Sequence, residues 1–150
     1  MKKLPLFVGA LALFAVAGIN LAMAANGNFS TVGVAPVIYQ TNWWHGPTVI
    51  HALSGTPSTA KISSVSLDWG YSRPPYNPNN PTYTIEAKIC TSSLCKYTTS
   101  FTDSLDPYWN GKPATADWQF SFNAISSTTK VFVTHLTQAH NIDLTVMYSY

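Results

Sequence analysis

Charged side chains are scarce in this chain of 150 residues, of which Asp, Glu, Lys and Arg make up 9%. Eight lysines and arginines stand against six aspartates and glutamates, and two of the eight, Lys2 and Lys3, lie at the N-terminus. Without those two, six positive charges face six negative ones. Such a balanced chain has no basic stripe for phosphate groups, which argues against nucleic acid and anionic membranes as partners.

Helical periodicity is also missing after the N-terminal segment, because β-branched residues and prolines interrupt each candidate window. Short alternating runs with regular turn signals remain. Low charge together with many Ser, Thr, Asn and aromatic residues is typical of exported β-domains. We therefore expect an all-β protein with about seven short strands. Two antiparallel sheets packed as a sandwich are the first expectation, and a partly closed β-barrel is the alternative.

Reactive motifs are the third absence. The two cysteines are not spaced as C-x-x-C, no G-x-S-x-G surrounds a serine, and the histidines have no zinc-finger spacing. The carboxylates are expected to be structural or solvated. We expect no catalytic residue, no cofactor and no metal site, and hence no enzyme. The four histidines, for which surface or hydrogen-bonding roles are expected, are His45, His51, His135 and His140.

The first 24 residues have the features of a cleaved signal peptide. Two lysines precede an apolar run from Leu4 to about Ala17, and Ala22-Met23-Ala24 fits the small-x-small pattern before a cleavage site. The run is too short to span a bilayer securely, so we expect no membrane insertion after its removal. Cleavage after Ala24 leaves residues 25–150 as a single all-β domain, periplasmic or secreted.

Several segments of the mature chain alternate apolar and polar residues and are expected to be strands. Gly27–Gln40 is interrupted at Pro36 and is therefore expected on a sheet edge. Val131–Leu136 is apolar on both faces, which favours a central strand. The last segment, Ile142–Tyr150, is expected to pair inside a sheet. The other expected strands are Val49–Leu53, Ser64–Tyr71, Thr82–Cys90, Cys95–Phe101 and Trp118–Asn123.

Cys90 and Cys95 stand at the mouth of a predicted β-hairpin whose loop is the four residues Thr91–Leu94. Cysteines that face each other across a ladder can form a disulfide with local adjustment, and an exported protein keeps it. This register places Lys96 on the same face as the apolar Ile89. We therefore expect either a bulge in the second strand or a shifted pairing.

Aromatic residues are in surplus in the predicted loops, where exposed rings usually make contacts. Trp69, Trp118, Phe120 and Phe122 are assigned to the core. Arg73–Pro81 and Thr102–Thr115 are read as long loops. Three interpretations stay open for the loop aromatics: they anchor a protein partner, they stack on sugar rings, or they cap the ends of the sandwich. The candidates for partner binding are Trp43, Trp44, Tyr108 and Trp109.

The order of these features resembles that of the flagellar FlhE family. After a leader comes a Gly-aromatic start, Gly27-Asn28-Phe29. The segments that carry the rest of the resemblance are Val65–Tyr71, Ala87–Cys95, Trp118–Phe122 and Asn141–Tyr148. Asn42–His45 and Arg73–Pro81 have no counterpart in the family pattern.

The resemblance implies a periplasmic all-β accessory protein without enzymatic activity. It also implies a link to flagellar assembly or to control of leakage through the flagellar export apparatus. The partner is then a periplasmic protein, such as a component of the flagellar rod or of the export apparatus. Only Cys90 and Cys95 carry over from the family, as a structural pair. An exported module that binds carbohydrate or envelope glycan through loop aromatics is the alternative function.

We predict that the exported protein contains no free thiol, because its only two cysteines face each other at the hairpin. Thiol counting under denaturing conditions measures this directly, and two reactive thiols would contradict it. The double variant Cys90→Ser with Cys95→Ser should fold but lose about 1–3 kcal/mol of unfolding free energy, because the closed loop is short. Urea unfolding of both forms measures the loss.

Overall fold

The computed structural model describes residues 24–74 and 77–150. The predicted signal peptide therefore lies outside the described residues, except for Ala24. Within the described ranges the chain forms ten strands, one 3-10 turn and no α-helix. No helix in those ranges is long and apolar enough to cross a membrane. The strands are β1 (Asn26–Gly33), β2 (Ile38–Gln40), β3 (His45–Ile50), β4 (Lys61–Tyr71), β5 (Thr84–Thr91), β6 (Leu94–Thr98), β7 (Thr102–Asp106), β8 (Trp118–Ile125), β9 (Val131–Leu136) and β10 (Gln138–Ser149).

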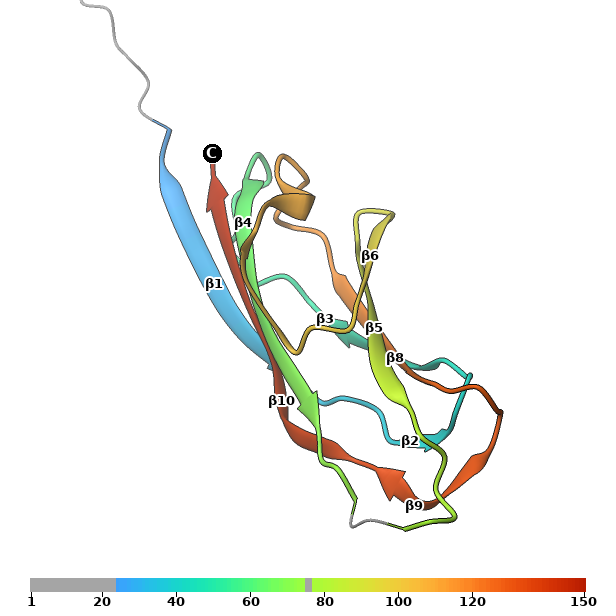
Figure 1. Ribbon diagram of the computed structural model, residues 1–150. Helices are drawn as coiled ribbons and strands as arrows, with labels where there is room; N and C mark the ends of the chain where they lie inside the picture. The colour runs from blue at the N-terminus through green and yellow to red at the C-terminus, as the bar shows by residue number, and fades with distance from the viewer. Residues whose placement is uncertain (1–23, 75–76) are drawn as a thin grey trace, which may run out of the picture.

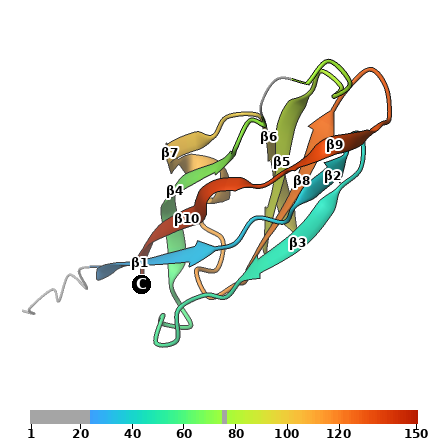
Figure 2. The same ribbon diagram turned by 90° about the horizontal axis from the view of Figure 1, so that it is seen from below.

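Two four-stranded sheets form the two layers of the molecule (Figure 1). The first sheet has the order β1-β10-β4-β7, and the second has the order β3-β8-β5-β6. The two-stranded pair β2-β9 lies at one end, at the bottom of Figure 1. Seen from below, the two layers remain separate sheets (Figure 2). The antiparallel sandwich is confirmed, and the barrel alternative is wrong.

Aromatic side chains fill the space between the sheets. The ring centroid of Trp69 on β4 lies 5.2 Å from that of Phe122 on β8, and the Tyr71 ring lies 5.3 Å from Phe122. Trp118 of β8 is fully buried and packs at 5.0 Å against Trp109. Tilted and edge-to-face pairs of this kind contribute beyond the area they bury. The four aromatic residues assigned to the core from the sequence are all buried.

The terminal segment and the first segment pair with each other. β10 lies between β1 and β4 in the first sheet, as expected for an alternating C-terminal strand, and β1 occupies the sheet edge. The chain leaves the ladder at residues 34–37, around Pro36, before it enters β2. Proline has no N–H to donate to a strand ladder, which explains why the pairing stops here.

Three assignments made from the sequence are wrong. β3 covers His45–Ile50, so only two residues of the expected strand Val49–Leu53 belong to it. β9 is not central, because it pairs only with the three-residue β2 and leaves Val131 and Val133 both 63% exposed. Its two apolar faces therefore do not reflect burial on both sides. Thr102–Thr115 is not one loop, because its first five residues form β7 on the edge of the first sheet. A five-residue edge strand with four polar side chains has little of the periodic signal on which the assignment relied.

The predicted hairpin is present in the expected register but with a shorter turn. Cys90 pairs with Cys95, and the two form a disulfide with Cα atoms 4.1 Å apart. Only Ser92 and Ser93 form the turn, with φ angles of 49° and 65°. Positive φ at both central residues belongs to the two-residue hairpin turn whose twist matches that of the strands. The sequence expectation missed it because serine is not a usual residue at these positions.

The ladder between β5 and β6 has neither the bulge nor the shift that the sequence led us to expect. Ile89 pairs directly with Lys96, so the lysine points to the inner face of the sandwich. There its amine forms ion pairs with Asp103 and Asp106 of β7. We call these three side chains the Lys96 ion cluster. It joins the edge strand of one sheet to the edge strand of the other.

The charges of this cluster stabilise each other. Burial by itself lowers the pKa of Lys96, but hydrogen bonds to Asp103 and Asp106 outweigh burial and raise that pKa above its ordinary value. Burial by itself raises the pKa of Asp106, and the hydrogen bond from Lys96 reverses this, so the Asp106 pKa is lowered. Lys96 and Asp106 therefore stay charged at neutral pH.

A β-bulge in β7 makes the cluster possible. Val65 pairs with Asp106 and Leu67 with Asp103, so three steps along β7 match two steps along β4. In a regular strand, residues three apart point to opposite faces, whereas one extra residue returns them to the same face. The bulge contains Leu105, which has a φ of 56° and a 60% exposed side chain.

We predict that Lys96→Ala lowers the unfolding free energy by about 2–3 kcal/mol. The substitution leaves two partly buried carboxylates without a counter-charge. The expected loss of unfolding free energy therefore lies between the losses for exposed and for fully buried ion pairs. Lys88→Ala on the outer face of β5 is the matched control, expected to cost about 0.5 kcal/mol or less. Urea unfolding compares the two, and equal losses would contradict the role of the cluster. Lys96→Met combined with Asp103→Asn and Asp106→Asn should regain part of the stability, because no charge is then left unpaired.

Candidate functional site

The turn that carries Trp43 and Trp44 is tied to the loop after β8. The side-chain amide of Asn42 donates to the carbonyl of Ser126, and its oxygen accepts from the Ser126 N–H, both at 2.9 Å. The buried Thr41 hydroxyl donates to the Thr128 carbonyl at 2.7 Å. These bonds fix the backbone on which the two indoles stand. Trp43 and Trp44 nevertheless remain 56% and 38% exposed.

Trp44 reaches an aromatic residue of another strand on the outer face of the second sheet. His45 is buried, so its neighbour Trp44 points outward, and its ring centroid lies 5.9 Å from that of Tyr97 on β6. Tyr97 is 54% exposed, and the amine of Lys88 lies 5.9 Å from the centre of its ring. We call Trp43, Trp44 and Tyr97 the aromatic patch.

Tyr97 was not among the binding residues predicted from the sequence. Because Tyr97 follows Lys96 in the strand, an inward-facing Lys96 places the Tyr97 side chain on the outer face. The patch is a set of exposed rings on a sheet face that also carries the amine of Lys88. Such a surface can bind an apolar or aromatic-rich protein segment or a sugar ring.

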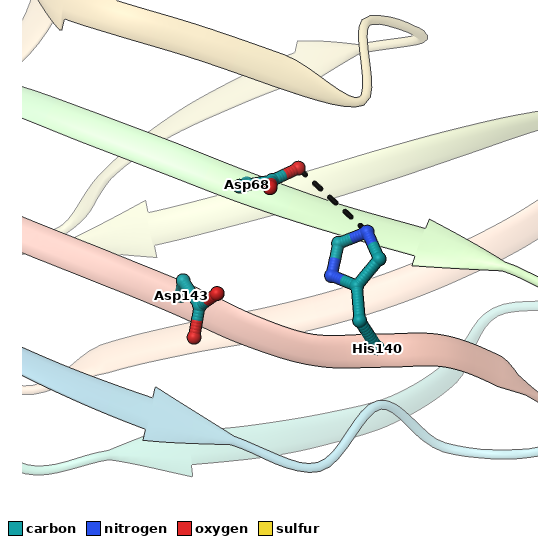
Figure 3. Close-up of side chains that lie close together, drawn as sticks. All are labelled: Asp68, His140 and Asp143. Carbon is teal, nitrogen blue, oxygen red and sulfur yellow. Dashed lines mark ion pairs between the residues drawn. The ribbon is translucent and has the colours of Figure 1, made fainter.

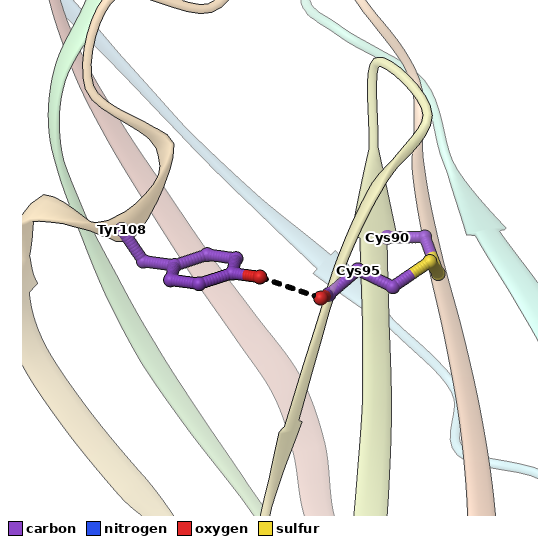
Figure 4. The surroundings of a disulfide bond; sticks show 3 residues. All are labelled: Cys90, Cys95 and Tyr108. Atoms are coloured by element: carbon purple, nitrogen blue, oxygen red, sulfur yellow. Dashed lines mark hydrogen bonds between the residues drawn. A yellow bond between two sulfur atoms is a disulfide. The ribbon is translucent and has the colours of Figure 1, made fainter.

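The other two predicted binding residues lie at the 3-10 turn Pro107–Trp109. The Asp106 side chain caps this turn by accepting from the Tyr108 N–H at 2.8 Å. The Tyr108 hydroxyl donates to the carbonyl of Cys95 at 2.7 Å, so the exposed ring connects the turn to the disulfide hairpin (Figure 4). Tyr108 thus reinforces the edge that the Lys96 ion cluster closes.

Trp109 is fully buried, so the expectation that its ring is exposed for a partner is wrong. Its indole packs against Trp118 and lies 5.9 Å from the Lys96 amine. Asp106 bends the chain directly before Pro107, and this turn directs Trp109 into the core. For Trp109, the interpretation of loop rings as caps on the sandwich holds.

The histidines lie in different environments. His51 pairs with Asp117 at 3.0 Å on the surface, and His135 packs edge-on against Tyr39. His140 lies near Asp68 and Asp143, two carboxylates expected from the sequence to be structural or solvated (Figure 3). Spacing along the chain gave no signal for this group, because a strand irregularity brings it together.

His45 is the buried histidine of the aromatic region. Its Nε2 accepts from the Tyr39 N–H at 3.3 Å, and the Tyr39 ring packs edge-on against it with centroids 4.4 Å apart. Burial lowers the pKa of His45 below its ordinary value of 6.5, and the backbone groups of Trp43 and Phe122 offset only part of this effect. His45 is therefore neutral at neutral pH and acts as part of the support beneath Trp44.

These features define a class: an antiparallel β-sandwich with a disulfide hairpin at one edge and solvent-facing aromatic rings on one sheet. No family model matches the chain, and no curated protein matches it. A solved structure described as the crystal structure of FlhE is similar to it, with a TM-score of 0.63 and 13% sequence identity. The similarity covers 83% of this chain and 98% of that one. The chain therefore has the fold of FlhE, as the resemblance in sequence implied.

We predict that protonation of His45 destabilises the fold. The pKa of His45 is lower in the folded state than the ordinary value of 6.5 that it has in the unfolded chain. The contribution of the neutral imidazole to the unfolding free energy is therefore complete above pH 6.5 and is lost as the pH falls through the lowered pKa. The unfolding free energy should therefore decrease between pH 7.5 and pH 5. Urea unfolding across this range measures it. His45→Gln should show a smaller decrease, whereas His51→Gln, altered at the surface, should behave like the unmodified protein.

Proposed function

We propose that this protein is an exported, non-enzymatic accessory protein of the flagellar system that works by contacting another protein in the periplasm. The observation that carries the proposal is the fold, which matches nearly the whole of the FlhE chain in the solved structure. The resemblance of the leader, the disulfide hairpin and the terminal strand to the FlhE family supports the same assignment.

The aromatic patch is the proposed contact surface. Large exposed rings on the surface of a domain commonly serve as anchors, and tryptophan and tyrosine are enriched among residues that dominate binding energy. Because Asn42 and Thr41 fix the underlying turn by hydrogen bonds, little backbone freedom is lost when a partner binds. The amine of Lys88, which lies beside Tyr97, would add a polar contact that makes binding more specific.

Export to the periplasm is supported by two features of the chain. Residues 1–24 have the composition of a signal peptide, and cleavage after Ala24 leaves the described domain intact. The Cys90–Cys95 disulfide is stable in an oxidising compartment such as the periplasm. The partner is then a protein exposed to that compartment, such as a component of the flagellar rod or of the export apparatus.

We predict that Trp43→Ala and Trp44→Ala each weaken capture of the partner by roughly thirtyfold, which corresponds to about 2 kcal/mol for an anchor residue. Both side chains are exposed, so the variants should keep the fold. Cross-linking in living cells, followed by identification of the captured protein, measures the effect. Tyr150→Ala is the matched control. Tyr150 is 51% exposed and directly follows β10, a strand of the other sheet.

The link to flagella is tested separately from the contact surface. A deletion strain should lose normal motility or the proton tightness of its envelope, and restoration by the unmodified gene serves as the control. Normal motility together with a tight envelope would contradict the flagellar assignment. Equal capture by the tryptophan variants and by Tyr150→Ala would contradict the assignment of the surface.

A second candidate function is binding of carbohydrate or envelope glycan. The contact between Trp44 and Tyr97 on an outer sheet face favours it, since neighbouring exposed rings can stack on sugars. The same cross-linking experiment separates the two candidates. Recovery of glycan with no protein, and its loss in Trp44→Ala, would favour this alternative over the protein partner.

A further inference from the structure

Three side chains with metal-binding atoms meet on the outer face of the first sheet. Asp68 lies on β4, and Asp143 and His140 lie on the neighbouring β10 (Figure 3). One ligand atom from each lies within 4.8 Å of the other two. The imidazole turns toward Asp68, with Nε2 3.7 Å from a carboxylate oxygen. We call these residues the Asp-His-Asp triad.

A bulge in β10 builds the triad. Asp143 pairs with Asp68, and His140 pairs with Gly70, so three steps along β10 match two steps along β4. Without that extra residue, His140 and Asp143 would point to opposite faces of the sheet. Bulges often re-aim a side chain beside a functional position. Here the bulge turns an imidazole toward two carboxylates.

The imidazole is held in one tautomer. Its Nδ1 lies 2.9 Å from the backbone carbonyl of Asn141, and because a carbonyl only accepts, Nδ1 carries the proton. In the neutral ring, the lone pair is then on Nε2, the atom that faces Asp68. Metal-binding histidines commonly show this arrangement, with the second ring nitrogen donating to a carbonyl or a carboxylate.

Gly70 provides the space for the ring. A Cβ placed at this position would lie 2.9 Å from His140 Nε2, too close for contact. The backbone of Gly70 does not require glycine, since its φ lies outside the left-handed region. The missing side chain therefore leaves room for the imidazole above the strand and for an ion at Nε2.

The two carboxylates lack a permanent counter-charge. They are direct cross-strand partners, an arrangement in which like charges destabilise a sheet. Among residues 24–74 and 77–150, no lysine or arginine lies within ion-pair distance of either carboxylate. A bound divalent cation would remove this repulsion and join β10 to β4.

From this geometry we infer that the Asp-His-Asp triad binds a divalent transition-metal ion, with Zn²⁺ as the representative. One imidazole nitrogen and two carboxylate oxygens suit Zn²⁺ and its neighbours, whereas Mg²⁺ and Ca²⁺ prefer oxygen ligands alone. Two ligands about 2.1 Å from a tetrahedral ion are roughly 3.4 Å apart, close to the observed 3.7 Å separation. Solvent completes the coordination, and the ion acts as a clip between two strands.

Calorimetric titration of the protein with Zn²⁺ alone tests the inference. We expect one saturable site and a raised melting temperature, with little effect of Mg²⁺ at the same concentration. His140→Gln, Asp68→Asn and Asp143→Asn should each weaken Zn²⁺ binding by at least about tenfold. These side chains are substantially exposed, so the variants should fold, and near-ultraviolet circular dichroism checks this.

Two further variants separate coordination from general surface binding. Gly70→Ala retains all three ligands but places a methyl group against Nε2, so it should also lose Zn²⁺ affinity. His51→Gln removes a histidine that faces the single carboxylate of Asp117 and should leave binding unchanged. If Zn²⁺ binds His140→Gln as tightly as the unmodified protein, or binds no site at all, His140 and Asp68 form only an ion pair and the inference is wrong.

Discussion

The amine of Lys96 determines how the two sheets meet at one side of the sandwich. A lysine on the inner face of a strand is unfavourable unless opposite charges compensate for the lost hydration. The two aspartates that do so lie on the edge strand of the other sheet. This contact depends on three features, namely the position of β7, its bulge at Leu105 and the capped turn before Trp109. The buried tryptophan pair beneath it then fills the space that the turn encloses.

Regular alternation made much of the fold predictable. The sandwich class, the buried aromatic strands and the internal position of β10 follow from the period of two. The edge position of β1 followed from Pro36, and the register of the cysteine hairpin from the length of its loop. The failures occur where that period breaks. Bulges in β7 and β10 bring residues three apart onto one face, so neither the Lys96 ion cluster nor the Asp-His-Asp triad is visible in the spacing.

Exposure was harder to predict than pairing. Trp43 and Trp109 both stand beside turn residues in the sequence, yet one is 56% exposed and the other fully buried. The difference comes from the local bonds: Asn42 ties its turn to a distant loop, whereas Asp106 bends the chain inward at Pro107. Such capping depends on three-dimensional neighbours. Composition alone cannot distinguish a ring held outward from one folded into the core.

The pairing of β1 with β10 sets the order of events during folding. β1 is synthesised first, but as an edge strand it has one ladder partner, and that partner ends one residue before the C-terminus. β1 therefore joins the first sheet only once β10 is available, and such long-range contacts form slowly. The second sheet has no strand from either end of the described chain, so its contacts can form before those of β1 with β10.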